Sequence, residues 1–241
     1  MQTSATTPVS TADRTSAAHL PMPGTRTAGV AIAAATILSI IFVALDDGAT
    51  GTTPTEIMQS MLQIKTMKQI VHGVAITSVL AYAFGYATLA NKLNLKRPLV
   101  LAGLTTYLIG CVAMIGATML DGFISNDVAA RFVIKPPADL QFGFNMIRFM
   151  GIALTDLAKL GWVLQAGAAM AWSAVLIEQR GLHRAVGFIG LLSGALVMAG
   201  VFTSDINMGM VAILGILLAQ AIWNLAAATL LIRNKEARSA A

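Results

Sequence analysis

Residues 98–120 read PLVLAGLTTYLIGCVAMIGATML, and these 23 residues include no charged side chain. A bilayer core about 30 Å thick needs about 20 mostly apolar helical residues for one crossing. The stretch therefore predicts a transmembrane helix. Six apolar stretches of this kind follow one another along the chain, at residues 28–45, 70–90, 98–120, 157–177, 185–203 and 208–232.

The composition agrees with a membrane protein. Hydrophobic residues make up 56% of the chain and charged residues 11%, whereas soluble domains carry about 25% charged residues. We therefore expect an all-α integral membrane bundle of six transmembrane helices, formed by residues 27–233. Residues 1–26 are rich in Ser, Thr, Ala and Pro and predict a disordered cytoplasmic tail, and residues 234–241 a short basic cytoplasmic tail. A cleaved signal peptide is the alternative for the first stretch.

The distribution of charge predicts the orientation of the bundle. One set of connections and both tails carry 10 Lys or Arg residues against three acidic residues, and the other side carries six against eight. Lys and Arg mark the cytoplasmic side of membrane helices, so both termini should be cytoplasmic. The net charge of +5 thus belongs to membrane-flanking loops, and we expect no nucleic-acid partner.

Two helices should begin well before their apolar stretches. Thr53, Pro54 and Glu56 form a capping box with proline at the first helical position. A helix from there into the second apolar stretch would be about 55 Å long, and so must project from the membrane or bend. A similar segment opens at Asp139 and Leu140, after Pro136 and Pro137, and continues into the fourth stretch. Residues 121–142 should face outward, after the third stretch ends at Leu120.

The helical hairpin that begins at Pro54 and the one that begins at Pro137 resemble each other in sequence. An offset of 87 residues aligns Leu95, Arg97, Gly103 and Leu104 with Leu182, Arg184, Gly190 and Leu191. Units at 54–121 and 137–205 would then form a parallel repeat, since the chain enters the membrane from the outward side in both units. Chance similarity between two apolar hairpins is the alternative.

Ionisable groups in or beside the spans are the candidates for function, because such groups are costly in a bilayer and usually face the bundle interior. They gather on the outward side, where we expect a polar vestibule. Asp156 and Lys159 share a helix face and could be a structural ion pair or a relay. His72 could titrate near neutral pH or simply anchor the helix. The vestibule candidates are Asp47, His72, Asp121, Arg148, Asp156, Lys159 and Asp205.

No cofactor or metal is expected. Cys111 is the single cysteine, which excludes an intramolecular disulfide, paired-thiol redox chemistry and Cys-ligated zinc. The outward His, Asp and Met residues form no local ligand motif, and the three histidines are too dispersed to hold haem. Catalytic signatures such as Gly-Xaa-Ser-Xaa-Gly are missing too, which weakens an enzymatic interpretation.

Several runs resemble small bacterial inner-membrane proteins that carry no assigned activity. The runs are LDGF at 120–123, AARF at 129–132, RGLHRAVG at 180–187 and AQAIWNL at 219–225. The resemblance implies a bacterial plasma-membrane location and no substrate. It also makes Asp121 and Gly122 the first residues to test.

The sequence favours a non-enzymatic protein that binds or moves a small species through the outward vestibule. An intramembrane enzyme that uses His72 and a carboxylate on a lipid or quinone is the first alternative. An accessory subunit of a membrane complex is the second. Expected partners are the lipid bilayer and either a membrane protein or a second copy of the chain.

Overall fold

The computed structural model describes residues 24–46, 48–203 and 210–233, and these residues form helices and short connections. Six helical runs are long and apolar enough to cross a membrane, as the sequence predicts. The elements are α1 (Thr25–Ala44), α2 (Pro54–Lys92), α3 (Pro98–Met119), the π-helix η1 (Leu120–Ile124), α4 (Ser125–Phe132), α5 (Pro137–Ile177), α6 (Leu182–Thr203) and α7 (Met210–Ile232). α1 already includes Thr25 and Arg26, which we had assigned to the tail, while residues 1–23 and 234–241 lie outside the described part.

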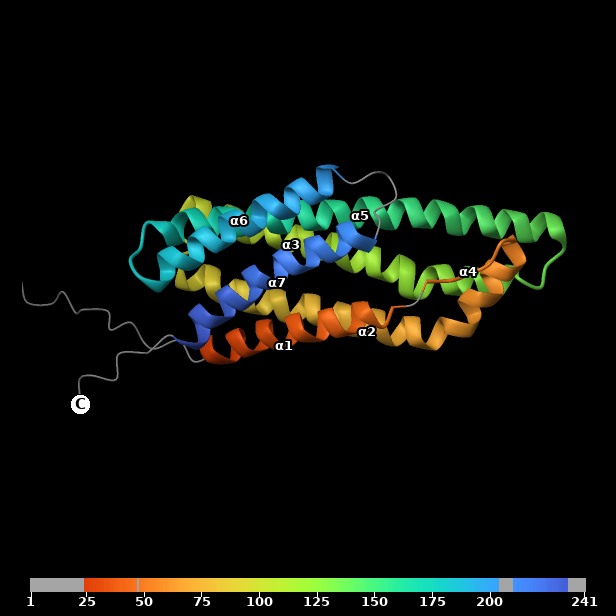
Figure 1. Ribbon diagram of the computed structural model, residues 1–241, viewed down its shortest axis with the longest axis horizontal. Helices are drawn as coiled ribbons and strands as arrows, with labels where there is room; N and C mark the ends of the chain where they lie inside the picture. Colours follow the sequence, from red (N-terminus) through yellow and green to blue (C-terminus); the bar gives the residue numbers. More distant parts are fainter. Residues whose placement is uncertain (1–23, 47, 204–209, 234–241) are drawn as a thin grey trace, which may run out of the picture.

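The helices form a closed ring in chain order. α1 packs on α2, α2 on α3, α3 on α5, α5 on α6 and α6 on α7, and α7 returns to α1. Since the six long runs alternate in direction, the start of α1 and the end of α7 lie at the same end of the molecule (Figure 1). We call this the terminal end.

α1 is an integral part of this ring. Ala28 and Ile32 are fully buried, and Ile32 packs against Gly85 of α2, where a Cβ would collide with it. On the other side of α1, a Cβ at Gly29 would lie 2.8 Å from the Ala228 carbonyl oxygen of α7. Glycine thus lets α1 approach both neighbours, as small residues do at membrane helix interfaces.

Four aromatic residues pack together inside the ring. The rings of Trp172 and Trp223 lie nearly parallel to that of Tyr86, at centroid distances of 5.3 and 6.1 Å, and Tyr107 is tilted against Tyr86 at 4.6 Å. The Tyr86 hydroxyl donates a hydrogen bond of 2.6 Å to Asn224 Oδ1, and the Trp172 indole donates one of 3.2 Å to the Val100 carbonyl. The cluster thereby ties α2, α3, α5 and α7 together.

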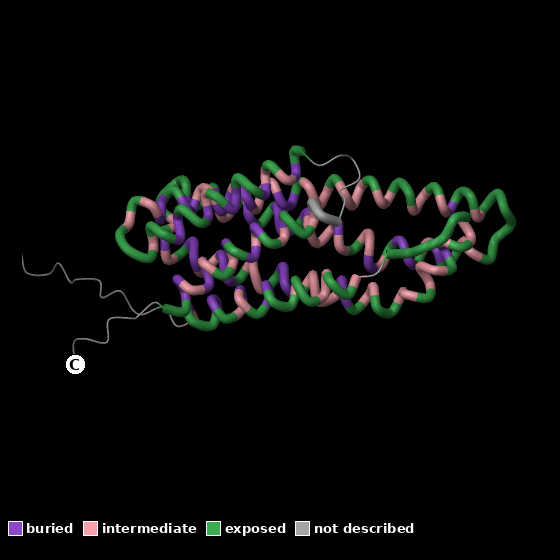
Figure 2. The backbone as a smooth tube through the Cα atoms, viewed as in Figure 1, coloured by how far each residue is buried: buried purple, intermediate pink, exposed green. Residues whose placement is uncertain are grey.

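Opposite the terminal end, α2, α4 and α5 continue beyond the ring as a helical extension (Figure 1). α2 has 39 residues and α5 has 41, which corresponds to about 58 and 61 Å. The predicted capping box is confirmed, since Thr53 Oγ1 accepts from the Glu56 N–H and the Glu56 carboxylate accepts from the Thr53 N–H. Figure 2 shows buried backbone concentrated in the ring and mostly exposed or half-buried backbone in the extension.

We expected the third run to end near Leu120, but the helical run extends further. α3 ends at Met119, but the chain continues through η1 and then α4 to Phe132. Residues 125–132 read SNDVAARF. This segment is too polar to be recognised in a search for apolar stretches. Lys65 of α2 pairs with Asp127 of α4 at 2.8 Å, so this polar helix is anchored on α2.

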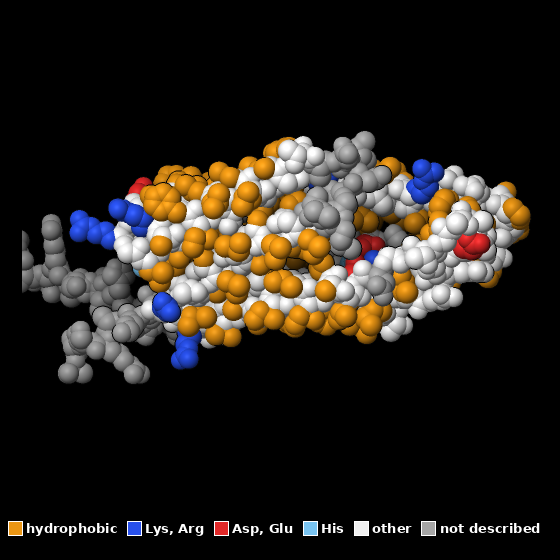
Figure 3. Space-filling model, in the orientation of Figure 1, with side chains coloured by type: hydrophobic (Ala, Val, Ile, Leu, Met, Phe, Trp, Pro, Cys, Tyr) orange, Lys and Arg blue, Asp and Glu red, His pale blue; other side chains and the backbone are white. Residues whose placement is uncertain are grey.

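The outer surface of the ring is apolar. Large hydrophobic side chains such as Val112, Leu192 and Phe202 are 64–74% exposed, and Figure 3 shows hydrophobic atoms along the bundle with Lys and Arg at the terminal end. A soluble monomer rarely exposes so large an apolar surface. Six candidate transmembrane helices with this surface indicate a multi-pass membrane protein.

Candidate functional site

A cavity of about 330 Å³ lies at the centre of the ring. Side chains of all six long helical runs line it, and most of them are apolar. Most of the polar lining residues form two groups at different depths. One lies where the ring meets the extension, and the other lies further toward the terminal end.

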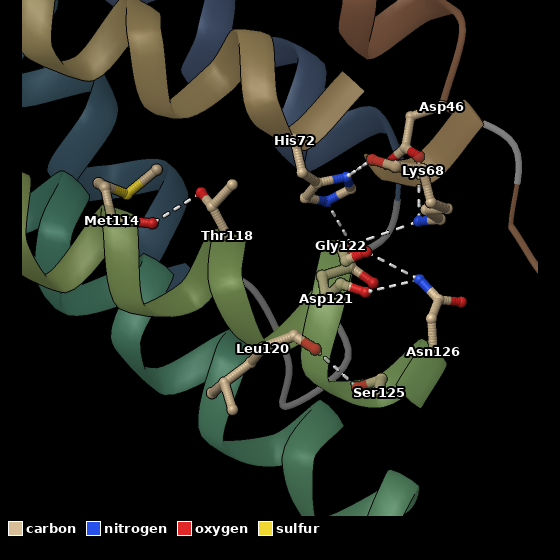
Figure 4. Close-up of polar contacts among 10 residues, drawn as sticks. All are labelled: Asp46, Lys68, His72, Met114, Thr118, Leu120, Asp121, Gly122, Ser125 and Asn126. Carbon is tan, nitrogen blue, oxygen red and sulfur yellow. Dashed lines mark hydrogen bonds and ion pairs between the residues drawn. The ribbon is translucent and has the colours of Figure 1, made fainter. Parts of the chain in front are cut away.

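The first group consists of Asp46, Lys68, His72 and Asp121, which we call the ion tetrad (Figure 4). Lys68 Nζ lies 3.0 Å from Asp46 Oδ1 and 3.3 Å from Asp121 Oδ2. His72 Nε2 lies 2.9 Å from the same Asp121 oxygen. Asp46, His72 and Asp121 line the cavity, so the tetrad forms its mouth.

The hydrogen bonds of His72 determine where protons can reside. Nδ1 lies 2.8 Å from the Lys68 carbonyl oxygen, which only accepts, so Nδ1 carries a proton. Nε2 faces a carboxylate, and this contact also requires a proton, bound either to Nε2 or to Asp121. His72 and Asp121 therefore share one proton and titrate as a pair.

The π-helix η1 places Asp121 in this pair. A π turn adds one residue to the helical turn, and such turns are frequent at functional sites. Ser125 Oγ donates a 2.7 Å hydrogen bond to the Leu120 carbonyl, and Asn126 Nδ2 donates one of 2.9 Å to the Gly122 carbonyl. These side chains supply donors to carbonyls at the π turn.

Gly122 lets η1 approach α2 closely. A Cβ at this position would collide with the His72 side chain, starting at the His72 Cβ. Gly73, the neighbour of His72, has open space where its Cβ would be. Close contact therefore requires glycine at position 122 and not at position 73.

The second group is neutral, and we call it the polar belt. Gln220 Nε2 donates to Gln165 Oε1 at 3.3 Å, and the Tyr82 hydroxyl donates to Thr36 Oγ1 at 3.2 Å. Tyr82 follows His72 by ten residues on α2, which places the belt about 15 Å deeper than the tetrad. The belt comprises Thr36, Ser39, Tyr82, Gln165, Gln220 and Asn224.

The structure brings together two of the predicted vestibule residues, His72 and Asp121. Arg148 and Asp156 are exposed and Lys159 is half-buried on α5, and these three do not line the cavity. A role for them, and the Asp156–Lys159 ion pair, stay predictions. Asp47 and Asp205 lie outside the described residues.

Sequence reasoning missed the central member of the tetrad, Lys68. A signal was available, since Lys68 and His72 are four residues apart and so share a helix face. Asp46 directly follows the first apolar stretch and is not among the predicted site residues. The contacts of the polar belt join different helices and could not be read from spacing along the sequence.

Asp46, His72 and Asp121 are the one group of described residues whose ligand atoms could converge on a metal ion, lying within 4.8 Å of one another. The Lys68 ammonium already pairs with both carboxylates, and His72 pairs with Asp121 as well. A divalent ion would have to displace that ammonium and take the proton from the His72–Asp121 pair. The geometry favours an internally compensated ion cluster.

Comparisons with known proteins give no family for this chain, since no protein-family model, no curated protein and no solved structure matches it.

Proposed function

We propose that this protein binds a small species in its central cavity and helps to move it across the bacterial plasma membrane. The observation that carries the proposal is a cavity lined by all six long helical runs with the ion tetrad at its mouth. Ligand sites in helical bundles are built in this way, from side chains on facing helices.

The charges of the described residues support an orientation with both termini in the cytoplasm. Among the described residues, the terminal end carries seven Lys or Arg residues and one acidic residue, Glu178. At the extension end, basic and acidic residues are equally numerous. The excess of Lys and Arg at cytoplasmic loops then places the extension and the tetrad outside. The seven basic residues are Arg26, Lys92, Lys96, Arg97, Arg180, Arg184 and Arg233.

The tetrad supports binding or transport more than acid–base catalysis. A general base needs a nitrogen within reach of the substrate proton, and both ring nitrogens of His72 are already engaged within the protein. An enzyme that acts on a lipid or quinone would have to break one of these hydrogen bonds in each cycle. A gate that opens when the tetrad rearranges needs no such chemistry.

Extraction of bound molecules tests the proposal without knowledge of the ligand. We expect organic extracts of the purified wild-type protein to contain a small molecule in near-stoichiometric amount, identified by mass spectrometry. Ala166→Leu and Ala221→Leu, which place larger side chains in the cavity lining, should deplete it at least fivefold.

Leu80→Phe is the matched control, because Leu80 is 57% exposed on the outer surface. Its extract should equal that of the wild type. Identical extracts from the wild type and both cavity-filled variants, with all proteins folded by circular dichroism, would overturn cavity binding.

A further inference from the structure

We infer that an alkyl chain dissolved in the outer leaflet of the membrane enters the cavity sideways, through an opening between α1 and α7. The inference rests on the proposed function. It specifies the ligand class, an amphiphile with a long apolar chain, and the route that this ligand takes. It follows from how α1 and α7 meet, from the side chains that line the cavity and from the depth of the opening.

α1 and α7 touch near the terminal end and separate toward the extension. A Cβ on Gly29 of α1 would lie 2.8 Å from the Ala228 carbonyl oxygen and 2.8 Å from the Ile232 side chain of α7. From this tight contact the two helices diverge toward the extension (Figure 1). They therefore close the ring at the terminal end, and side chains decide what lies between their outer halves.

The outer halves of α1 and α7 both line the cavity. Because the two helices run in opposite directions, residues at equal distances from the contact of Gly29 with Ala228 lie at about the same depth. Ile40 of α1 and Leu217 of α7 are each eleven residues from this contact, which is about 16 Å toward the extension. Both line the cavity, so the cavity extends between the two helices at this level.

Ile40 marks the place where the cavity meets the outer surface. Among the described residues that line the cavity, it is the one large hydrophobic residue that is also exposed, at 43%. Val43, Ile213 and Leu217 surround the same opening and are half-buried. We call the opening bordered by these four residues the side portal. Its apolar rim favours the passage of an apolar chain over that of a hydrated solute.

The side portal lies at the depth of lipid tails. α1 has 20 residues, or about 30 Å, which matches the hydrocarbon core of a bilayer. Ile40 precedes the end of α1 at Ala44 by about 6 Å, so it lies inside the core on the extension side. With the extension outside the cell, this side is the outer leaflet. Lipid tails and not water then face the side portal.

The interior of the cavity suits an alkyl chain. Its volume of about 330 Å³ lies at the small end of ligand pockets, which span roughly 300–1,000 Å³. The side chains of the polar belt are uncharged, and apolar side chains surround them. A charged group at the belt would lose its hydration without gaining a counter-ion, which is costly. The chain of the amphiphile therefore occupies the cavity, and its polar head stays near the tetrad or outside the side portal.

Photoreactive amphiphiles in proteoliposomes test this route. Each probe carries a diazirine at the end of its alkyl chain, and mass spectrometry locates the adducts on the protein. We expect adducts on Trp162 and Ala166, which line the cavity, in addition to adducts on the outer surface at Val112 and Leu192. Ile40→Trp should lower the ratio of cavity to outer-surface adducts about fivefold or more, because extra side-chain volume in a confined space excludes the chain.

Ile41→Trp is the matched control, because Ile41 is 48% exposed and is not among the residues that line the cavity. Its adduct ratio should equal that of the wild type, whereas Leu217→Trp, on the other side of the portal, should act like Ile40→Trp. Equal ratios in the wild type and all three variants, with each protein folded by circular dichroism, would overturn the side portal.

Two probes distinguish the sources of the chain, a phosphatidylcholine and a single-chain alcohol. Cavity adducts from both support entry of phospholipid tails, and cavity adducts from the alcohol alone support a free single-chain amphiphile. If neither probe forms cavity adducts but organic extracts still contain a molecule that Ala166→Leu depletes, the inference fails and cavity binding stands. If cavity adducts and bound molecules are both missing, the inference and the proposed function fail together.

Discussion

At the scale of single residues, the tetrad joins two carboxylates, one ammonium and one imidazole with a shared proton. Each carboxylate has a cationic partner, and Lys68 serves both. Partly buried charges persist only with such compensation, and removal of one partner leaves the other uncompensated. The tetrad is therefore sensitive to small displacements of η1 against α2.

Gly122→Ala tests this sensitivity. The new Cβ would collide with His72, so we expect a loss of stability of about 1–3 kcal/mol from overpacking and a weaker His72–Asp121 contact. Chemical denaturation and the imidazole NMR signals of His72 measure the two effects. Gly73→Ala should leave both nearly unchanged, since its Cβ meets open space; equal behaviour of the two variants would show that η1 and α2 are not closely packed.

Asn126→Ala tests how the π turn is held. Asn126 is 1% exposed and donates to the Gly122 carbonyl, so we expect a loss of about 1–3 kcal/mol when this buried bond is removed. Asn145→Ala is a suitable comparison, because the Asn145 side chain is on exposed α5 surface and bonds to Gln141. Equal stability of Asn126→Ala and the wild type would contradict a structural role.

His72 and Asp121 could be chosen from sequence because each is an ionisable group at the border of an apolar stretch. Asp46 borders the stretch at 28–45 in the same way, and Lys68 lies two residues before the stretch at 70–90, so position along the sequence does not separate these two from the other charges near the stretches. Their importance follows from η1, and a π turn leaves no pattern in residues 120–124 that distinguishes it from ordinary helix.

At the scale of elements, local signals located the helix starts well. Proline at the first helical position marks the start of α2, α3 and α5. α4 was missed because it is short and polar, and its position depends on contacts with α2 and α5. The parallel repeat stays a prediction, although two aligned glycines, Gly103 and Gly190, each adjoin an indole of the next helix in the ring.

Thr53→Ala tests the capping box at the start of α2. The loss of the Thr53 Oγ1 bond to the Glu56 N–H should destabilise the first turn by about 1 kcal/mol. Hydrogen exchange should then accelerate in residues 54–60, while amides of the ring are unaffected. Thr53→Ser should restore the wild-type rate, and unchanged exchange in Thr53→Ala would show that the extension does not depend on this cap.

The burial of α1 predicts that the mature protein retains it. Cleavage after residue 44 would expose Tyr82 and Gly85 of α2 and open the ring between α2 and α7. Intact-mass spectrometry of protein purified from membranes should therefore include α1. A mass that begins after residue 44 would support the signal-peptide interpretation.

At the scale of the whole molecule, the closing contact of α7 with α1 creates the cavity. Hydropathy predicts six helices and charge predicts their alternation, but neither gives the order of helices around a ring. The cavity depends on that order, because Thr36 of α1, Tyr82 of α2 and Gln220 of α7 contribute to one polar belt. Pairings between residues so distant in sequence need the folded structure.

Accessibility of single cysteines to a membrane-impermeant methanethiosulfonate reagent tests the central claim most directly. In a Cys111→Ser background, Thr118→Cys reports on the cavity lining, Leu80→Cys on the outer apolar surface and Lys96→Cys on the terminal end. With intact cells we expect modification of Thr118→Cys alone, and modification of Lys96→Cys only after lysis. Labelling of Lys96→Cys from outside, or an unreactive Thr118→Cys in folded protein, would contradict an outward-opening cavity in a six-helix membrane ring.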